Sequence, residues 1–186
     1  MQNQNLDFSS FPLIETSRLT MRKLDISDAP LLYNFRTDPA VMRYLDRPLA
    51  KNVEEVEALI RLIEEGIENS SSITWGIVHK SDKRFIGTIG FWKIDAMNYR
   101  AEIGYLLDSA YHQQGLMTEA IQFVLDFGFK QINLHSVEAN INPSNIASAK
   151  LLEKVGFRKE AHFKENYYYD GKFLDSVIYS LLNYSV

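Results

Sequence analysis

The sequence predicts an α/β fold: an α+β mixed sheet of about seven strands with helices on both faces. Three observations predict this class. Segments with strand character cluster between residues 74 and 107 and are separated by short polar turns. A strand, helix, strand, helix order follows over residues 103–155. Asp170-Gly171 then separates two final apolar segments and is the strongest short hairpin signal in the chain.

The first strand is expected over residues 18–24, where apolar and polar side chains alternate. Ser27 or Asp28 can cap the following helix, and Pro30 suits its first turn. This helix should end near Asp38-Pro39, because the residue before a proline is pushed out of helical geometry. Its buried side is expected to consist of Leu31, Leu32 and Phe35.

Two further helical segments are expected before the sheet continues. One begins around residues 41–45, and a longer one starts after Asn52. The longer segment should keep its acidic side chains in solvent and bury one apolar stripe. That stripe contains Val56, Leu59, Ile60 and Ile63.

A meander of three strands should come next. Residues 74–78 and 84–92 are predicted to form a hairpin, and residues 99–107 supply the third strand after a turn at 95–98. Farther along, residues 134–141 are expected to be a strand and residues 143–155 a helix.

The end of the chain is predicted to form a hairpin. Gly156 should end the preceding helix as its C-terminal cap. Residues 157–169 and 173–182 are the two strands expected on either side of Asp170-Gly171.

Composition excludes several classes of protein. The 186 residues are 46% hydrophobic and 24% charged, which suits a single domain over residues 1–186 in which residues 1–12 form a loosely ordered extension. The formal net charge of −4 argues against a nucleic-acid partner. The absence of cysteine excludes disulfides, thiolate metal ligands and a covalent cysteine mechanism, and no histidine has a partner at metal-ligand spacing, so no metal is expected.

The sequence has no feature that would send it to a membrane. Residues 1–12 lack the basic and apolar regions of a signal peptide, and no apolar run approaches 18 residues. A cytoplasmic protein without a membrane partner is therefore expected, and it can be a monomer or a homodimer.

Residues 111–120 have the character of an anion-binding turn. They follow the apolar run 103–107 and lead into a helix, whose first-turn N–H groups and positive dipole end attract phosphate oxygens. Gly115 allows the backbone to approach such a group closely. An apolar stripe should fix the helix to the sheet. It consists of Leu116, Ala120, Phe123, Val124 and Phe127.

A second motif lies about 25 residues farther along the chain. Asn145 and Ser148 stand three residues apart, and Leu-Glu-Lys-Val-Gly-Phe follows at residues 152–157. With the Gln-Gly-Leu-Met-Thr-Glu-Ala segment before it, this motif resembles the GNAT acetyltransferases and, among them, the RimJ/RimL-like branch that acetylates ribosomal-protein N-termini. The resemblance covers residues 19 to 182 and implies the GNAT fold and acetyl-CoA as the acetyl donor.

The resemblance also implies which residues hold acetyl-CoA. The turn would bind its pyrophosphate through backbone amides, although His112 and Gln113 depart from the family pattern. The turn residues expected to contact the cofactor are His112, Gln113, Gln114, Gly115, Leu116, Met117 and Thr118. Backbone amides around Tyr105, Leu106 and Leu107 would bind the thioester carbonyl beside a gap between two strands. Gly104 is compatible with a bulge there or with simple packing tolerance.

Glu102 is the carboxylate best placed to act as a base. Its neighbours in residues 101–107 should be buried in the sheet, and burial would raise its pKa toward the working range of a base. It would accept the proton of the amine directly or through water. The alternative is that Glu102 is a structural partner of Arg100 or another cation.

Three further residues complete the expected site. Many GNAT members have a tyrosine where this chain has Leu152, so Ser148, one helical turn earlier, would stabilise or protonate the leaving thiolate instead. Asn145 resembles a residue that binds the pantetheine amides, and Asn140 can orient substrate or water. Alternatively, Asn145 only caps the helix and Ser148 only packs.

These observations favour an acetyl-CoA-dependent N-acetyltransferase that works by direct attack of a primary amine in a ternary complex. The acceptor would be a protein N-terminus, for example of a ribosomal protein, or a small amine. A non-catalytic acyl-CoA sensor is the alternative. A nucleotide-binding domain is disfavoured because neither phosphate-loop fingerprint, Gly-x-x-x-x-Gly-Lys-Ser/Thr or Gly-x-Gly-x-x-Gly, is present.

Overall fold

A computed structural model describes residues 6–183 and contains one mixed sheet with helices on both faces. The described strands follow the spatial order β1-β2-β3-β4-β5-β6-β8-β7. Their bounds are β1 Ile14–Glu15, β2 Leu19–Lys23, β3 Ile73–His79, β4 Arg84–Asp95, β5 Arg100–Leu107, β6 Ser136–Ile141, β7 Arg158–Tyr169 and β8 Lys172–Leu182.

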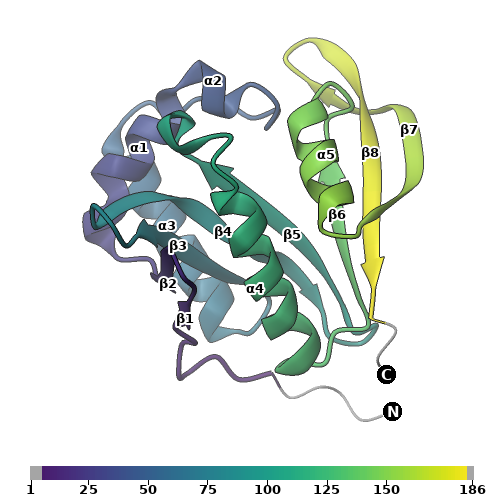
Figure 1. Cartoon of the computed structure of the whole chain (residues 1–186). Helices are drawn as coiled ribbons and strands as arrows, with labels where there is room; N and C mark the ends of the chain where they lie inside the picture. The colour runs from purple at the N-terminus through teal and green to yellow at the C-terminus, as the bar shows by residue number, and fades with distance from the viewer. Residues whose placement is uncertain (1–5, 184–186) are drawn as a thin grey trace.

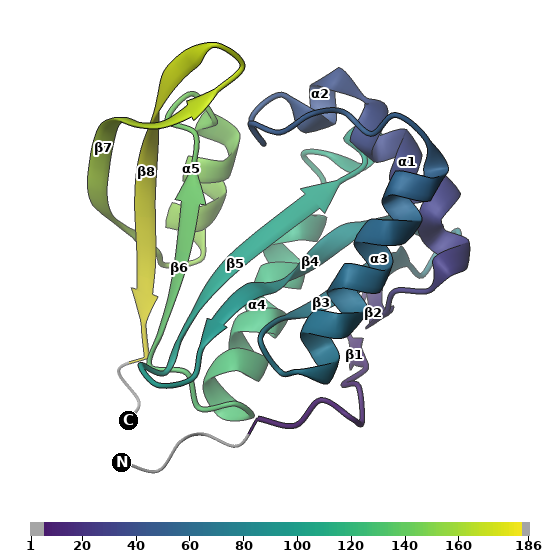
Figure 2. The same cartoon turned by 180° about the vertical axis from the view of Figure 1, so that it is seen from behind.

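The helices divide between the two faces of the sheet. Helices α4 and α5 lie on the face turned toward the viewer in Figure 1, and α1 and α3 cover the opposite face, seen in Figure 2. The helical bounds are η1 Ile26–Asp28, α1 Ala29–Thr37, α2 Pro39–Met42, α3 Val53–Glu68, η2 Ser109–Tyr111, α4 Leu116–Lys130 and α5 Ile146–Lys154. The mixed α/β class expected from the sequence is therefore confirmed.

Each face of the sheet has its own apolar core. The larger core lies between the sheet and α4, where Trp75, Phe91 and Ile121 are fully buried. The smaller core joins α1 and α3 to the sheet through Phe35, whose ring stacks on Phe85 at 5.8 Å. Burial on both faces holds the central strands rigidly, because apolar area is removed from water on each side.

One pair of neighbouring strands is parallel, and the sheet opens at this pair. Strand β5 pairs with β6 in parallel only from Arg100–Ser136 to Glu102–Glu138. Beyond Glu102 the two strands diverge, which is plain in Figure 2. The end of β5 and the turn before α4 line one cavity, so the fold brings this turn and the divergent strands together.

Several apolar side chains that were expected to be buried are exposed or only partly buried, and three of them show the reason. Leu31, expected on the buried side of α1, is 39% exposed, and Phe123, expected in the stripe of α4, is 41% exposed. Leu59 of α3 is only partly buried and lines a cavity. Each lies at the edge of its helical stripe, where a small helix rotation decides burial.

The start of α1 is capped differently from expectation. Asp28 occupies the N-cap position but makes no side-chain cap hydrogen bond; it accepts from the Asp25 N–H and binds Arg22 at 2.7 Å. The capping side chain is that of Asp25, which accepts from the Ser27 N–H at 2.8 Å. A cap before η1, a short 3-10 turn, therefore starts the whole helical segment.

Residues 8–12 contact the main core of the protein. Of the predicted loose extension 1–12, residues 1–5 lie outside the described residues. Within the remainder, Phe8 is buried and the Phe11 ring lies 5.7 Å from that of Trp75. The Trp75 indole N–H donates to the Pro12 carbonyl at 2.7 Å. These contacts attach residues 8–12 to the main core and lead into β1, a strand the sequence did not indicate.

Candidate active site

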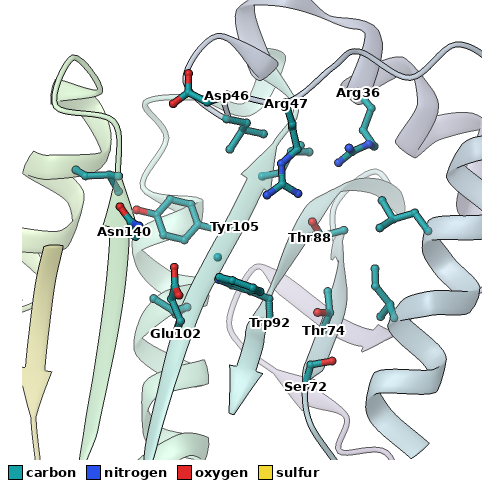
Figure 3. Close-up of a pocket in the computed structure, with 18 of the residues that line it drawn as sticks. Arg36, Asp46, Arg47, Ser72, Thr74, Thr88, Trp92, Glu102, Tyr105 and Asn140 are labelled. Atoms are coloured by element: carbon teal, nitrogen blue, oxygen red, sulfur yellow. The ribbon is translucent and has the colours of Figure 1, made fainter. Parts of the chain in front are cut away.

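Two cavities meet in the gap between β5 and β6. The first, the loop cavity, encloses about 550 Å³ between α2, α5 and the turn before α4. The second, the Glu102 cavity, encloses about 580 Å³ on the side of α1 and α3 and is shown in Figure 3. Tyr44, Leu45, Tyr105 and Leu106 line both. The two cavities are therefore adjacent.

The turn before α4 offers free hydrogen-bond donors to the loop cavity. Across residues 6–183, no backbone N–H from Gln113 to Thr118 has a hydrogen-bond acceptor, and the ladder of α4 begins with the Glu119 N–H, which donates to the Gly115 carbonyl. Six consecutive donors at a helix N-terminus form a strong anion site, because the helix dipole adds to their partial charges.

The conformation of the turn depends on Gly115. Gly115 is the N-cap of α4 and has φ +74°, in the left-handed region that L side chains rarely adopt. A Cβ built there would meet only Arg18, at 3.7 Å. Backbone conformation and ligand access, rather than contact with other side chains, therefore explain the glycine.

An ion pair between an exposed arginine and a half-buried glutamate attaches the turn to the edge of the sheet. Arg18 binds Glu119 at 2.7 Å and donates to the Gln114 carbonyl at 2.9 Å. Burial raises the pKa of Glu119, but hydrogen bonds from Thr16, Arg18 and Ser17 outweigh it and lower that pKa to about 2. The Glu119 carboxylate is therefore charged and fixes the first turn of α4 in place.

Nearly every residue expected to contact a cofactor lines the loop cavity. Gln114 does not; its side chain donates to the Ala110 carbonyl at 3.1 Å. The expected residues that line the cavity are Tyr105, Leu106, Leu107, His112, Gln113, Gly115, Leu116, Met117, Thr118, Asn145 and Ser148. Three cations that were not anticipated also line it, namely Arg43, Lys150 and Lys154.

The backbone of β5 presents two N–H groups to the gap. The Asp108 N–H donates to Ile86 of the β4 side at 2.8 Å. Backbone groups alternate along a strand, so the N–H of Leu106 also faces β4 and those of Tyr105 and Leu107 face the gap. The Leu107 carbonyl faces it too and accepts from His112 Nε2 at 3.0 Å. Of the three amides expected to face the gap, two do.

Ser148 and Tyr105 form a hydrogen-bonded pair where the cavities meet. Their oxygen atoms lie 2.5 Å apart, and Ser148 is buried. Burial raises the pKa of Tyr105 to about 12, with the Ser148 hydrogen bond acting in the opposite direction. The Tyr105 hydroxyl therefore keeps its proton at neutral pH. The sequence marked Tyr105 only for its backbone, so this hydroxyl is a new member of the site.

Asn145 caps α5, as the structural alternative anticipated. Its side-chain oxygen accepts from the Ser148 N–H at 3.1 Å. Its amide nitrogen has no acceptor within residues 6–183 and borders the loop cavity. The cap fixes the side chain and leaves the N–H₂ group available to a ligand.

Glu102 lies in the Glu102 cavity and does not pair with Arg100. Arg100 binds Glu138 instead, at 2.5 Å, so the structural alternative for Glu102 is wrong with respect to Arg100. Burial, followed by the negative charge of Glu138, raises the pKa of Glu102. Trp92 and Lys93 oppose this rise more weakly. The direction is the one a proton acceptor near neutral pH requires.

The bulge near Glu102 lies on the neighbouring strand. Strand β4 shifts register between Phe91 and Lys93, so the extra residue is Trp92. A Cβ on Gly104 would lie 3.2 Å from the Trp92 ring, and the glycine therefore makes room for the indole. Trp92 in turn forms one wall of the Glu102 cavity (Figure 3).

Asn140 completes the floor of the Glu102 cavity. Its side chain extends from β6 toward Tyr105 and Glu102 (Figure 3). Arg36 and Arg47, which the sequence did not mark, project into the cavity from the opposite wall. They come from α1 and from the connection between α2 and α3, so only the folded chain brings them to the site.

Comparison with known proteins identifies the family. The family model described as acetyltransferase (GNAT) domain matches residues 18–158. The chain belongs to the GNAT acetyltransferase family. It is an N-acetyltransferase and resembles the RimJ/RimL-like ribosomal-protein acetyltransferases within this family.

Three curated relatives agree in class, and the name of one of them states its acceptor. The probable N-acetyltransferase YjcK of Bacillus subtilis is 37% identical over 64% of this chain and 67% of its own length, and N-acetyltransferase YoaA of the same organism is 31% identical over 92% and 97%. The [ribosomal protein uS5]-alanine N-acetyltransferase of Escherichia coli is 28% identical over 64% and 62%.

Solved structures agree in fold. An acetyltransferase (GNAT family) from Bacillus anthracis has a TM-score of 0.82 at 25% identity, covering 92% of this chain and 98% of that one. RimL, the ribosomal L7/L12 α-N-protein acetyltransferase, in complex with coenzyme A has a TM-score of 0.84 at 22% identity, with the same coverage.

Two features are absent from the described part of the chain. Residues 6–183 contain no group of three His, Cys, Asp or Glu side chains arranged to hold a metal ion. None of their helices combines the length and apolar character needed to cross a membrane.

Proposed function

We propose that the protein transfers the acetyl group of acetyl-CoA to a primary amine by direct attack in a ternary complex. One observation carries this proposal: backbone N–H groups without an acceptor among residues 6–183 belong to residues 113 and 115–118, which line the loop cavity, and Tyr105 lines both this cavity and the Glu102 cavity. The first end suits a diphosphate and the second suits an amine. Two adjacent cavities of this kind suit transfer between two bound substrates.

The donor would lie in the loop cavity. Backbone N–H groups of residues 113–118 would bind its pyrophosphate, and Lys150, Lys154 and Arg43 would neutralise further phosphate charge. The Asn145 amide would bind the pantetheine arm. The gap beyond Glu102 leaves the N–H groups of Tyr105 and Leu107 free to bind the thioester carbonyl oxygen as it becomes negative.

The chemical step needs a base and a hydrogen-bond donor for the leaving group. The amine nitrogen attacks the thioester carbonyl carbon, the carbon–sulfur bond breaks, and one amine proton passes to Glu102, directly or through water. Ser148 would donate a hydrogen bond to the leaving thiolate, and Tyr105 would orient and polarise Ser148. Asn140 would orient the amine or the water beside Glu102.

The strength of the base limits the kind of amine. An α-amine is roughly 10% neutral at pH 7, a penalty of about 1.4 kcal/mol, whereas a lysine amine pays about 4.6 kcal/mol. A glutamate whose pKa is raised by burial suits the smaller penalty. We therefore favour an α-amine acceptor, and the names of the ribosomal-protein acetyltransferase relatives are consistent with this class.

The test is release of free thiol from acetyl-CoA in the presence of α-amine peptides and small amines, followed by a product mass increase of one acetyl group. Turnover that is lost in Glu102→Gln supports the enzyme. Tight CoA binding without turnover on any acceptor would support the alternative, a non-catalytic acyl-CoA sensor.

A further inference from the structure

The wall of the Glu102 cavity opposite Glu102 carries two positive charges. Arg36 extends from α1 and Arg47 from the connection after α2, and Figure 3 shows both guanidinium groups directed into the cavity. Neither forms an ion pair with a carboxylate anywhere in residues 6–183. Arg36 is half-buried and Arg47 is exposed, and a half-buried guanidinium such as that of Arg36 is uncommon without a carboxylate, because its desolvation is not offset.

The carboxylates that line the same cavity do not neutralise this pair. They are Asp46 and Glu102. Asp46 accepts hydrogen bonds from Tyr167 at 2.5 Å and from Asn142 at 3.0 Å, and in Figure 3 it points away from the guanidinium groups. Glu102 lies on the opposite wall beside Asn140. The charges are therefore separated, positive toward α1 and negative on β5.

The two arginines are also separate from the proposed donor site. Arg43, Lys150 and Lys154 line the loop cavity, whereas Arg36 and Arg47 line only the Glu102 cavity. Burial lowers the pKa of Arg36, and the nearby charge of Arg47 lowers it further. Two cations that repel each other in a cleft are stabilised by an anion that binds between them.

We propose that the acceptor is an amine that also carries a carboxylate, which Arg36 and Arg47 bind while the amine lies beside Glu102. The inference rests on the proposed acetyl transfer and narrows its acceptor. Guanidinium groups bind carboxylates in a fixed geometry with charge-assisted hydrogen bonds. The same charges repel a polyamine, which has no anionic group to offer.

The first experiment compares acceptors that differ only in the carboxylate. Ala-Glu-Ala-amide and Ala-Gln-Ala-amide differ in one side chain, alanine and alaninamide differ in the α-carboxylate, and spermidine represents a cationic acceptor. If one charge-assisted hydrogen bond to the carboxylate forms, kcat/KM should be roughly 10- to 100-fold higher for the carboxylate-bearing acceptor than for its amide in at least one pair. The pair that shows it identifies whether the carboxylate comes from a peptide side chain or from a free amino acid.

The second experiment removes the charges one at a time. Arg36→Gln and Arg47→Gln should each raise KM for the acidic acceptor roughly 10-fold or more and leave its amide analogue and the Kd of CoA unchanged. Arg61→Gln is the matched control, because Arg61 lies on the exposed side of α3, pairs with Glu57 and does not line the cavity. Thermal unfolding of each variant shows whether it is folded.

Failure of this inference differs from failure of the transferase. Turnover with equal kcat/KM for acid and amide in both pairs, or preferential turnover of spermidine, overturns the carboxylate acceptor and leaves acetyl transfer intact. If no acceptor turns over, calorimetry of the N-acetylated peptides in the presence of CoA decides. Arginine-dependent binding of the acidic peptide would support the anion site, and equal binding of both peptides would refute it.

Discussion

The turn before α4 can be tested by placing a negative charge where the diphosphate is expected. Gly115→Glu introduces a side chain at φ +74°, which costs about 1–2 kcal/mol of stability because of the left-handed backbone. It also brings one charge close to the ligand. A charge pair about 6 Å apart at an effective dielectric constant of about 20 repels by about 2–3 kcal/mol.

The expected effect is a rise of roughly 30- to 150-fold in the Kd of CoA, measured by calorimetry. Gly115→Gln has almost the same bulk and the same backbone strain without the charge, so the difference between the two variants isolates the electrostatic contribution. Gly171→Glu is a second control. Gly171 has φ +77° at the tip of the last hairpin, with nothing within 4 Å of an added Cβ, so it should lose stability and retain CoA affinity.

The reasoning would be refuted if folded Gly115→Glu bound CoA within about threefold of Gly115→Gln. It would also fail if Gly171→Glu weakened the binding of CoA as strongly as Gly115→Glu does, because the effect would then come from general destabilisation of the protein.

The remaining predictions concern the chemistry and the attachment of α4. Because the pKa of Glu102 is raised, a plot of log(kcat/KM) against pH should fall at low pH with a limiting slope of 2, one proton for the amine and one for Glu102. Glu102→Gln should lower kcat/KM about 100-fold and reduce that slope to 1. An unchanged pH profile in this variant would show that Glu102 takes no part in the reaction. Ser148→Ala and Tyr105→Phe should each lower kcat roughly 10- to 100-fold. The kcat of the double variant should be only slightly lower than that of either single variant, because the two hydroxyls act as one unit. Losses that add in the double variant would contradict this pairing. The pKa of Glu119 is lowered to about 2, so the stability that its carboxylate contributes is complete above the ordinary pKa of 4.5 and disappears as the pH falls from there toward 2. Glu119→Gln should lower the free energy of unfolding at pH 7 by about 1–2 kcal/mol and flatten its pH dependence between these two pH values. A stability curve parallel to that of the unaltered protein would argue against the ion pair with Arg18.

Much of the fold follows from local patterns. Strand-like segments between short polar turns located the strands of the meander, and Asp170-Gly171 located the final hairpin, because both signals act within a few residues. The positive φ of Gly156 agrees with its predicted place as the C-terminal cap of a helix, whereas the positive φ of Gly115 was not predicted. The exposure of Leu31 and Phe123 could not be predicted from the sequence, since it depends on how each helix is rotated against the sheet.

The site could be predicted only in part, for the same reason. The turn 112–118 is contiguous in sequence, so its motif is visible without the fold. The Tyr105–Ser148 hydrogen bond joins residues 43 positions apart, and the pairing of Arg100 with Glu138 depends on strand register. Arg36 and Arg47 reach the cavity from α1 and a loop whose positions no local pattern specifies. Contacts between distant segments were therefore the ones missed.

The central claim is that main-chain N–H groups of residues 113–118 bind the diphosphate. Titration of the ¹⁵N-labelled protein with CoA, followed by amide chemical shifts, measures this directly. We expect the largest downfield proton shifts at several of these amides, and 3′-dephospho-CoA, which keeps the pyrophosphate, should reproduce them. Saturating CoA with unmoved amides in this turn, and large shifts elsewhere, would contradict the claim.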